Sequence, residues 1–184
     1  MRLPIKIFIL YFLLVFGYVV AEGKCNPESV KAKDIMACIH MSHSIIDGML
    51  NDRYSVILKK ENFPYGSTLK EGERLWMAYR DSKCKYIYES IYPGMEAEVE
   101  RESCLLSLTY SRLLELIYIE SSVRDTSLER LLMRTEWRER YDSLDAGTMG
   151  VEESAYFMKN CELVGALYGE SKENCMKRMW VQNL

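Results

Sequence analysis

The chain has 184 residues, of which 48% are hydrophobic and 28% charged, and its formal net charge is −3 at pH 7. This length suits one domain, or one domain with an appendage. The acidic balance argues against nucleic acid as a partner, because binding to phosphates needs clustered positive charge. It is compatible with a cationic protein as partner, through electrostatic steering.

Residues 1–21 are typical of a secretory signal peptide. Arg2 and Lys6 form a basic start, a nearly continuous apolar run follows, and Ala21 ends a cleavage site. The run is shorter than the ~20 residues that a membrane-spanning helix needs, so an uncleaved anchor is the weaker interpretation. Cleavage would leave 22 basic against 27 acidic side chains, a net charge of −5. We therefore expect a periplasmic or secreted protein with no membrane span after cleavage.

All six cysteines follow the expected cleavage site, and an even number in an exported chain indicates disulfide bonds. Connectivity does not follow from sequence alone, but chain order favours pairing between neighbours. The expected pairs are Cys25–Cys38, Cys84–Cys104 and Cys161–Cys175. Each small ring would contribute roughly 3 kcal/mol through chain entropy. Zinc binding is disfavoured, because the sequence contains no C-x-x-C spacing.

Helical spacing of apolar residues, with almost no strand-like alternation, predicts an all-α fold of antiparallel helical hairpins, a bundle stapled by disulfides. The first helix should open at Asn26, with Pro27 in its first turn, and run to about residue 60. After a loop over residues 62–66, Thr68 and Glu71 have the spacing of a capping box. They predict the start of a second helix, which should end near residue 92.

The second helix places Trp76, Arg80 and Cys84 on or near its inward face. A buried guanidinium must be paired and hydrogen-bonded, because an isolated buried charge is very costly. We expect Arg80 to be the polar centre of the core, in one network with Asn51 and Arg112. Asp81 should point elsewhere and pair with Lys85, four residues on.

The expected start of the third helix contains three acidic residues, Glu96, Glu98 and Glu100. Negative charge there interacts favourably with the helix dipole. Thr126 and Glu129 repeat the capping-box spacing and predict a helix over residues 128–144. Two shorter helices should follow at about 154–167 and 173–181. Gly169 should end the first of these, and Ser171 should cap the second.

Three blocks of the sequence resemble the LprI-like lysozyme-inhibitor domain: LNDRY at 50–54, LWMAYRDSKC at 75–84 and SCLLSLTYSRLLEL at 103–116. The residues that match the family pattern are Leu50, Asn51, Tyr54, Trp76, Arg80, Asp81, Cys84, Cys104, Leu105, Thr109 and Arg112. The early pair of cysteines fits as well. The glutamine that often precedes the tryptophan is absent. The resemblance implies a helical domain over 22–120, followed by a helical extension over 121–184.

The family includes members that inhibit lysozyme, so the resemblance implies a binding protein rather than an enzyme. We expect it to occlude a lysozyme-type muramidase stoichiometrically, with no cofactor. The candidate surface joins the loop at residues 64–66 to the acidic stretch that follows the second helix. Its residues are Tyr65, Glu96, Glu98, Glu100 and Glu102, with Tyr86, Tyr88 and Tyr92 expected nearby.

Two alternatives stay open. The protein could be an envelope structural or assembly factor that never meets lysozyme. It could also be a periplasmic metal carrier, because His40 and His43 lie one helical turn apart near sulfur ligands that copper or zinc accept. Ser67 and Lys70 match the S-x-x-K pattern of penicillin-recognising enzymes, but that family's other elements are absent, so helix capping accounts for Ser67.

Overall fold

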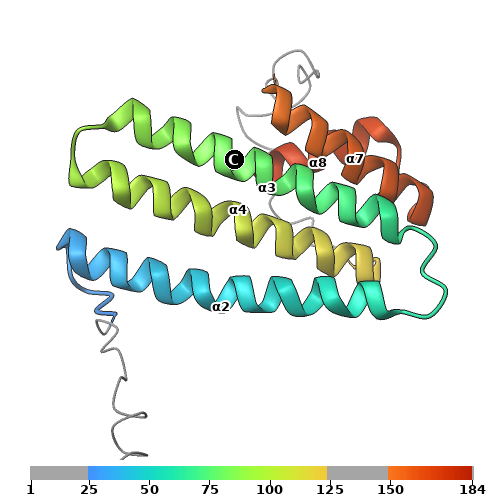
Figure 1. Cartoon of the computed structure of the whole chain (residues 1–184), viewed down its shortest axis with the longest axis horizontal. Coiled ribbons are helices and arrows are strands. Elements are labelled where there is room, and N and C mark those ends of the chain that lie inside the picture. The colour runs from blue at the N-terminus through green and yellow to red at the C-terminus, as the bar shows by residue number, and fades with distance from the viewer. Residues whose placement is uncertain (1–24, 124–148, 184) are drawn as a thin grey trace, which may run out of the picture.

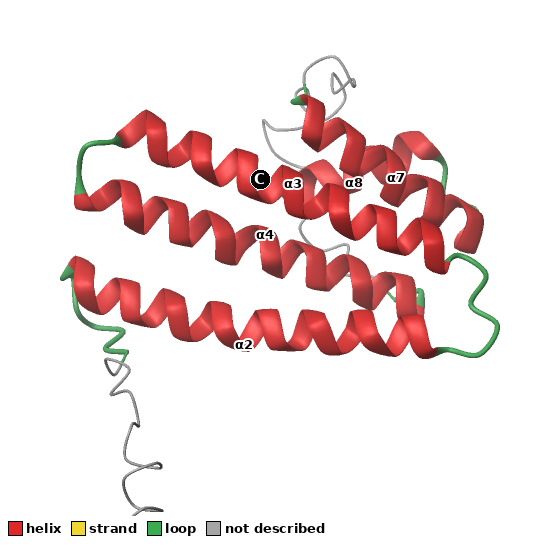
Figure 2. Cartoon of the chain, in the orientation of Figure 1, coloured by secondary structure: helices red, strands yellow, loops and turns green. Residues whose placement is uncertain are grey.

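The computed structural model describes residues 25–123 and 149–183 (Figure 1). These residues form five helices: α2 (Ala32–Lys59), α3 (Gly66–Ile91), α4 (Met95–Ser121), α7 (Val151–Tyr168) and α8 (Lys172–Gln182). Within the described ranges there is no strand, and the predicted all-α fold is confirmed (Figure 2). No helix in these ranges is long and apolar enough to cross a membrane. The predicted signal peptide and the helix expected over 128–144 lie outside the described residues.

The three long helices run side by side, with α4 in contact with both α2 and α3 (Figure 1). A loop joins α2 to α3 at one end of this layer, and a shorter connection joins α3 to α4 at the opposite end. The shorter helices form a second layer, in which α7 packs on α3 and α8 packs on α7. The C-terminal helices therefore share the core of the family-like segment.

Two helix starts differ from prediction. Asn26 lies in a turn, where its side chain accepts a hydrogen bond from the backbone N–H of Glu28, and α2 begins only at Ala32. α3 begins at Gly66, so Thr68 already lies inside the helix and the predicted capping box does not form. At the C-terminal end the signals hold. Gly169 ends α7 with φ of +70°, and the Ser171 hydroxyl caps α8 by accepting a hydrogen bond from the backbone N–H of Asn174 at 3.2 Å.

All six cysteines are paired, as Cys25–Cys38, Cys84–Cys104 and Cys161–Cys175. These are the neighbouring pairs that chain order favours. One bond ties the N-terminal segment to α2, one ties α3 to α4, and one ties α7 to α8. The α3–α4 and α7–α8 hairpins are thus closed covalently.

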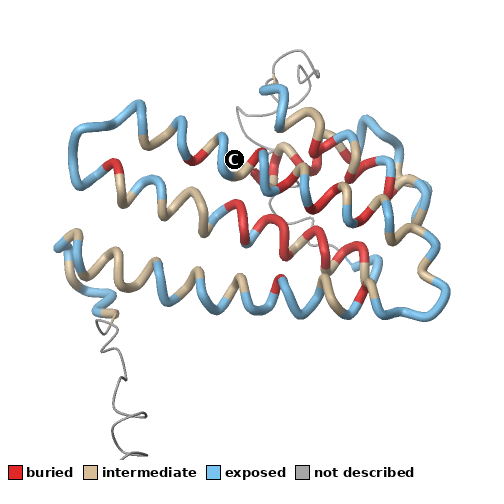
Figure 3. The backbone as a smooth tube through the Cα atoms, in the orientation of Figure 1, coloured by how far each residue is buried: buried red, intermediate tan, exposed pale blue. Residues whose placement is uncertain are grey.

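Burial is concentrated where α7 and α8 cover the long helices (Figure 3). We call this region the packed half; it comprises α7, α8 and residues 46–59, 66–79 and 108–121 of the long helices. The remaining stretches, residues 32–45, 80–91 and 95–107, form the open half. Within these three stretches only Cys84 and Ala97 are buried. The core therefore sits at one end of a long helical layer.

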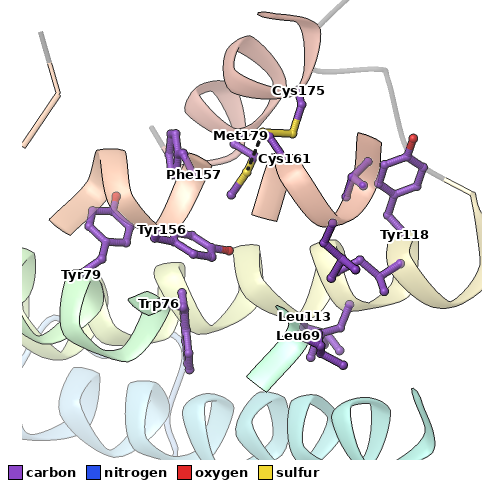
Figure 4. Close-up of a cluster of buried hydrophobic side chains, with 14 of the residues drawn as sticks. Leu69, Trp76, Tyr79, Leu113, Tyr118, Tyr156, Phe157, Cys161, Cys175 and Met179 are labelled. Atoms are coloured by element: carbon purple, nitrogen blue, oxygen red, sulfur yellow. Dashed lines mark hydrogen bonds between the residues drawn. A yellow bond between two sulfur atoms is a disulfide. The ribbon is translucent and has the colours of Figure 1, made fainter. Parts of the chain in front are cut away.

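Aromatic side chains fill the contact between α3 and α7. Tyr79 stacks on Tyr156 with ring centroids 5.8 Å apart and meets Phe157 edge-on at 6.0 Å (Figure 4). Trp76 lies beside this group, and the disulfide between Cys161 and Cys175 closes its far side (Figure 4). Such offset and edge-on ring pairs add to the stabilisation from burial.

Candidate functional site

A buried guanidinium does form the polar centre of the core, and it belongs to Arg112. Its side chain is 1% exposed, and its Nε and Nη2 lie 2.9 Å from Glu73 Oε2. Its Nη1 donates to Asn160 Oδ1 at 2.9 Å. The group also lies 5.5 Å from the centre of the Tyr156 ring. Arg112 on α4 thus joins α3 to α7 through charged and aromatic contacts.

A second buried pair continues this arrangement towards α8. Glu115 is fully buried, accepts from Asn160 Nδ2 at 2.7 Å and is paired with Arg178. Arg178 also donates to Glu170 at 3.0 Å. We call the whole set the charge network: Glu73, Arg112, Glu115, Asn160, Glu170 and Arg178. Because each buried charge faces an opposite charge, the desolvation cost is offset.

The charge network keeps its two arginines ionised. Burial alone lowers the pKa of Arg112, but its contacts with Tyr156 and Glu73 outweigh burial and raise that pKa above its usual value. Burial likewise lowers the pKa of Arg178, and the carboxylates of Glu115 and Glu170 raise it again by a larger amount. Both side chains therefore act as fixed cations that hold helices together, not as groups that exchange protons.

The prediction that Arg80 occupies this position is wrong. Its side chain is 20% exposed, lies 4.9 Å from the centre of the Trp76 ring, and pairs with the adjacent Asp81 at 2.7 Å. Arg80 lies at the start of the open half of α3, just beyond the ring contacts that Tyr79 makes with Tyr156 and Phe157. The predicted partners are also different. Asp81 does not pair with Lys85, which instead contacts Glu89 at 3.6 Å.

The family motif divides between core and surface. Trp76 is buried as expected, and among the described residues its Nε1 has no hydrogen-bond partner. Tyr54 packs against the core, and burial raises the pKa of its hydroxyl. The buried Thr109 donates to Leu105 O at 2.7 Å. Asn51, by contrast, is exposed and bonds to Asp47 within α2, so its predicted place in the network is wrong. The motif is largely a packing motif.

Sequence reasoning missed most of the charge network. Glu73 lies between Leu69 and Trp76 on the inward face of α3, and this position could have identified it. Glu115 lies three residues after Arg112, among apolar residues of α4, which is a similar signal. Asn160 on α7 and Arg178 on α8 could not be identified in this way, because only the tertiary fold brings them to α4.

The two histidines join α2 to α4. His40 Nε2 lies 3.6 Å from Glu102 Oε2, and His43 Nε2 lies 3.2 Å from Thr109 Oγ1. Across residues 25–123 and 149–183 no group of three or more histidine, cysteine or acidic side chains could hold a metal ion. The histidines therefore have a structural explanation that needs no metal.

The structure separates the two parts of the predicted binding surface. Tyr65 caps the start of α3, whereas Glu96 lies in the first turn of α4, beyond the other end of α3 (Figure 1). The 26 residues of α3 span about 39 Å at the usual helical rise. Tyr65 is partly buried, with its hydroxyl 3.5 Å from Ala166 O. The loop at residues 64–66 and the acidic stretch therefore cannot form one continuous patch.

The tyrosines and acidic residues around the connection between α3 and α4 remain together. Tyr88 and Tyr92 lie with ring centroids 5.6 Å apart, close in sequence to the acidic start of α4. Glu102 is the exception, because its side chain is only 14% exposed and is shared between Arg101 and His40. This end of the molecule carries most of the predicted surface.

Comparison with known proteins identifies one family. A family model described as lysozyme inhibitor LprI matches residues 25–116, which is half of the chain. No curated protein and no solved structure matches. The match ends within α4, so it includes Glu73, Arg112 and Glu115 but not their partners on α7 and α8. The chain belongs to the LprI lysozyme-inhibitor family.

Proposed function

We propose that the protein is a non-catalytic inhibitor that binds a lysozyme-type muramidase and occludes its cleft, one molecule to one. The observation that carries this proposal is the LprI match over residues 25–116. The matched segment contains α2, α3 and most of α4, which are the helices that form the open half. An inhibitor needs an accessible, pre-shaped surface, and the open half offers one.

The scaffold suits inhibition by rigid docking. Two disulfides close the α3–α4 and α7–α8 hairpins, a third ties the N-terminal segment to α2, and the charge network locks α3, α4, α7 and α8 against one another. A surface held rigid before binding loses less conformational entropy when the complex forms. All six cysteines are consumed in disulfides, so no thiol remains to act as a nucleophile.

Charge supports a cationic target. The chain carries 27 acidic against 24 basic side chains, and removal of residues 1–21 would make the balance more acidic. Opposite net charges speed association, and added salt screens the effect. Disulfides also suit the oxidising compartments outside the cytosol, so we propose that the protein acts in the periplasm or after secretion.

A turbidity assay tests this proposal. Residues 22–184, purified in oxidised form, are titrated into a basic lysozyme that is clearing a suspension of bacterial cell walls. We expect clearing to stop, with the titration saturating near one inhibitor per enzyme, and the inhibition to weaken as salt is raised. The same protein after reduction and alkylation is the control and should not inhibit. Full clearing at several-fold molar excess of oxidised protein would remove the inhibitor hypothesis and leave the envelope-assembly alternative.

A further inference from the structure

Four large apolar side chains are exposed at or near the connection between α3 and α4. Tyr86 is 72% exposed, Tyr92 64%, Met95 61% and Ile91 39%. We call these four residues, together with Glu89, Glu96 and Glu100, the α3–α4 tip. Figure 1 shows the tip at the end of the helical layer away from α7 and α8. Clustered exposed apolar side chains on a soluble protein mark an interaction site.

The tip is also strongly acidic. Residues 85–102 contain five glutamates against two basic side chains. Both bases are already engaged, Lys85 with Glu89 and Arg101 with Glu98 and Glu102. Glu96 and Glu100 are exposed and form no ion pair within the described parts of the chain. Two exposed carboxylates without an ion pair therefore lie in the first turns of α4, close in sequence to the exposed tyrosines.

The tip is held in one shape before any partner arrives. The Cys84–Cys104 disulfide joins the two helices that carry it, a few residues below the exposed side chains. Tyr88 and Tyr92 pack ring against ring, and Ser90 Oγ donates to Ile87 O at 2.8 Å. Rigid aromatic side chains that end in a polar group supply contact area at low entropic cost. They are enriched among the residues that dominate binding.

The opposite end of α3 lacks this combination. Lys59 and Lys60 lie exposed next to Glu61, so the charge there is not acidic overall. Lys60 Nζ is tied to Glu120 O at 3.0 Å, and Tyr65 is partly buried against the core. A cationic partner would therefore find its electrostatic complement at the α3–α4 tip and not at the loop over residues 64–66.

We propose that the α3–α4 tip is the surface that docks on the target, a basic muramidase, with its tyrosines and Met95 against the cleft and Glu96 and Glu100 facing cationic groups at the rim. This inference rests on the proposed function and narrows it to one end of the molecule. The apolar side chains supply the affinity, and the two carboxylates supply the rate of association and its salt dependence.

Paired substitutions in the oxidised protein of residues 22–184 test the apolar part. Tyr86→Ser/Met95→Ser removes exposed apolar groups from the tip and spares the Tyr92–Pro93 connection. Tyr110→Ser/Met158→Ser is the matched control, because Tyr110 is 49% and Met158 46% exposed and both lie in the packed half. We expect the inhibition constant of the tip variant to rise at least ~10-fold, as for loss of a binding hot spot. The control should inhibit as the unmodified protein does, and both variants should keep its melting temperature.

Charge substitutions test the second part. Glu96→Gln/Glu100→Gln should slow association several-fold at low salt and flatten the salt dependence, whereas Glu61→Gln/Glu152→Gln, away from the tip, should do neither. If the unmodified protein inhibits and both tip variants inhibit equally well, the tip is not the docking surface, although the proposed function stands. If the unmodified protein does not inhibit at all, the proposed function and the tip proposal both fall.

Discussion

The packed half and the open half use the same three long helices but stabilise them differently. The packed half, with the short connection between α7 and α8 that carries Glu170, contains the charge network and nearly all of the buried apolar side chains. The open half has almost no core, yet four of the six cysteines lie in it or directly before it, as Cys25–Cys38 and Cys84–Cys104. Where burial is scarce, covalent cross-links replace it, as they do in small secreted domains.

This division lets one molecule combine a stable core with an exposed surface. Burial stabilises a region by removing its surface from solvent, so a fully packed helix leaves no surface free to bind a partner. A disulfide acts mainly by restricting the unfolded chain, and it leaves the folded surface exposed. In the open half, the helices can therefore stay ordered while their tyrosines remain accessible to solvent.

The largest expected effect lies in the packed half. Arg112→Met should lower the free energy of unfolding by about 3–5 kcal/mol, because Glu73 would remain buried without its counter-charge. Denaturant titration followed by circular dichroism measures the loss.

Arg80→Met is the matched control for this experiment. Arg80 is paired at the surface with Asp81, so its loss should cost less than about 1 kcal/mol. Equal losses for the two variants would show that the network has no special place in the fold, and that the contrast between the halves is wrong.

The next effect lies in the open half. Replacing Cys84 and Cys104 together with alanine should cost roughly 3 kcal/mol, as for a ring of 20 residues. Because few contacts hold this region otherwise, hydrogen exchange should accelerate mainly in residues 80–91 and 95–107. Exchange by mass spectrometry resolves the two halves. Uniform acceleration through α7 and α8 would mean that the disulfide supports the whole core and not the open half.

The smallest effect is a pH dependence at the boundary between the halves. Burial, followed by the nearby charge of Glu153, raises the pKa of Tyr79 well above its ordinary value. The folded protein therefore keeps this proton while the unfolded chain loses it near pH 10. The stabilisation that Tyr79 contributes to the folded protein is therefore full below about pH 10. Above that pH it declines, by at most ~1.4 kcal/mol per pH unit for one group.

Thermal melts between pH 8 and 11 measure this decline, and Tyr79→Phe should make it shallower. The difference between the variant and the unmodified protein at pH 8 serves as the reference, since it contains the two lost hydrogen bonds of the hydroxyl, one donated to Glu153 and one accepted from Lys83, each at 3.2 Å. Parallel pH curves for the two proteins would exclude Tyr79 as the source of alkaline instability.

Sequence reasoning succeeded where local rules decide the outcome. Helix type follows from apolar spacing, and Gly169 and Ser171 mark helix ends by backbone conformation and capping that involve only a few neighbouring residues. The burial of Trp76 follows from the inward face of α3. All of these depend on interactions within about one helical turn, which periodicity captures.

Sequence reasoning failed where the burial of a side chain depends on which helices pack against each other. Arg80 and Glu73 lie on the same face of α3, but Glu73 meets Arg112 of α4, whereas Arg80 pairs with the neighbouring Asp81. Arg112 needs Asn160, which is 48 residues away and outside the matched segment. A helical wheel shows which side of a helix faces inward, but not how far along the helix the cover extends.

The order of the disulfides has a consequence for how the protein is made. The three disulfides neither enclose nor interleave with one another, because each joins two cysteines that follow one another along the chain. During synthesis from the N-terminus, each thiol meets its correct partner before any cysteine of a later pair has emerged. Oxidation can therefore finish bond by bond, and a simple oxidant without a bond-reshuffling isomerase should suffice to produce the native pairing.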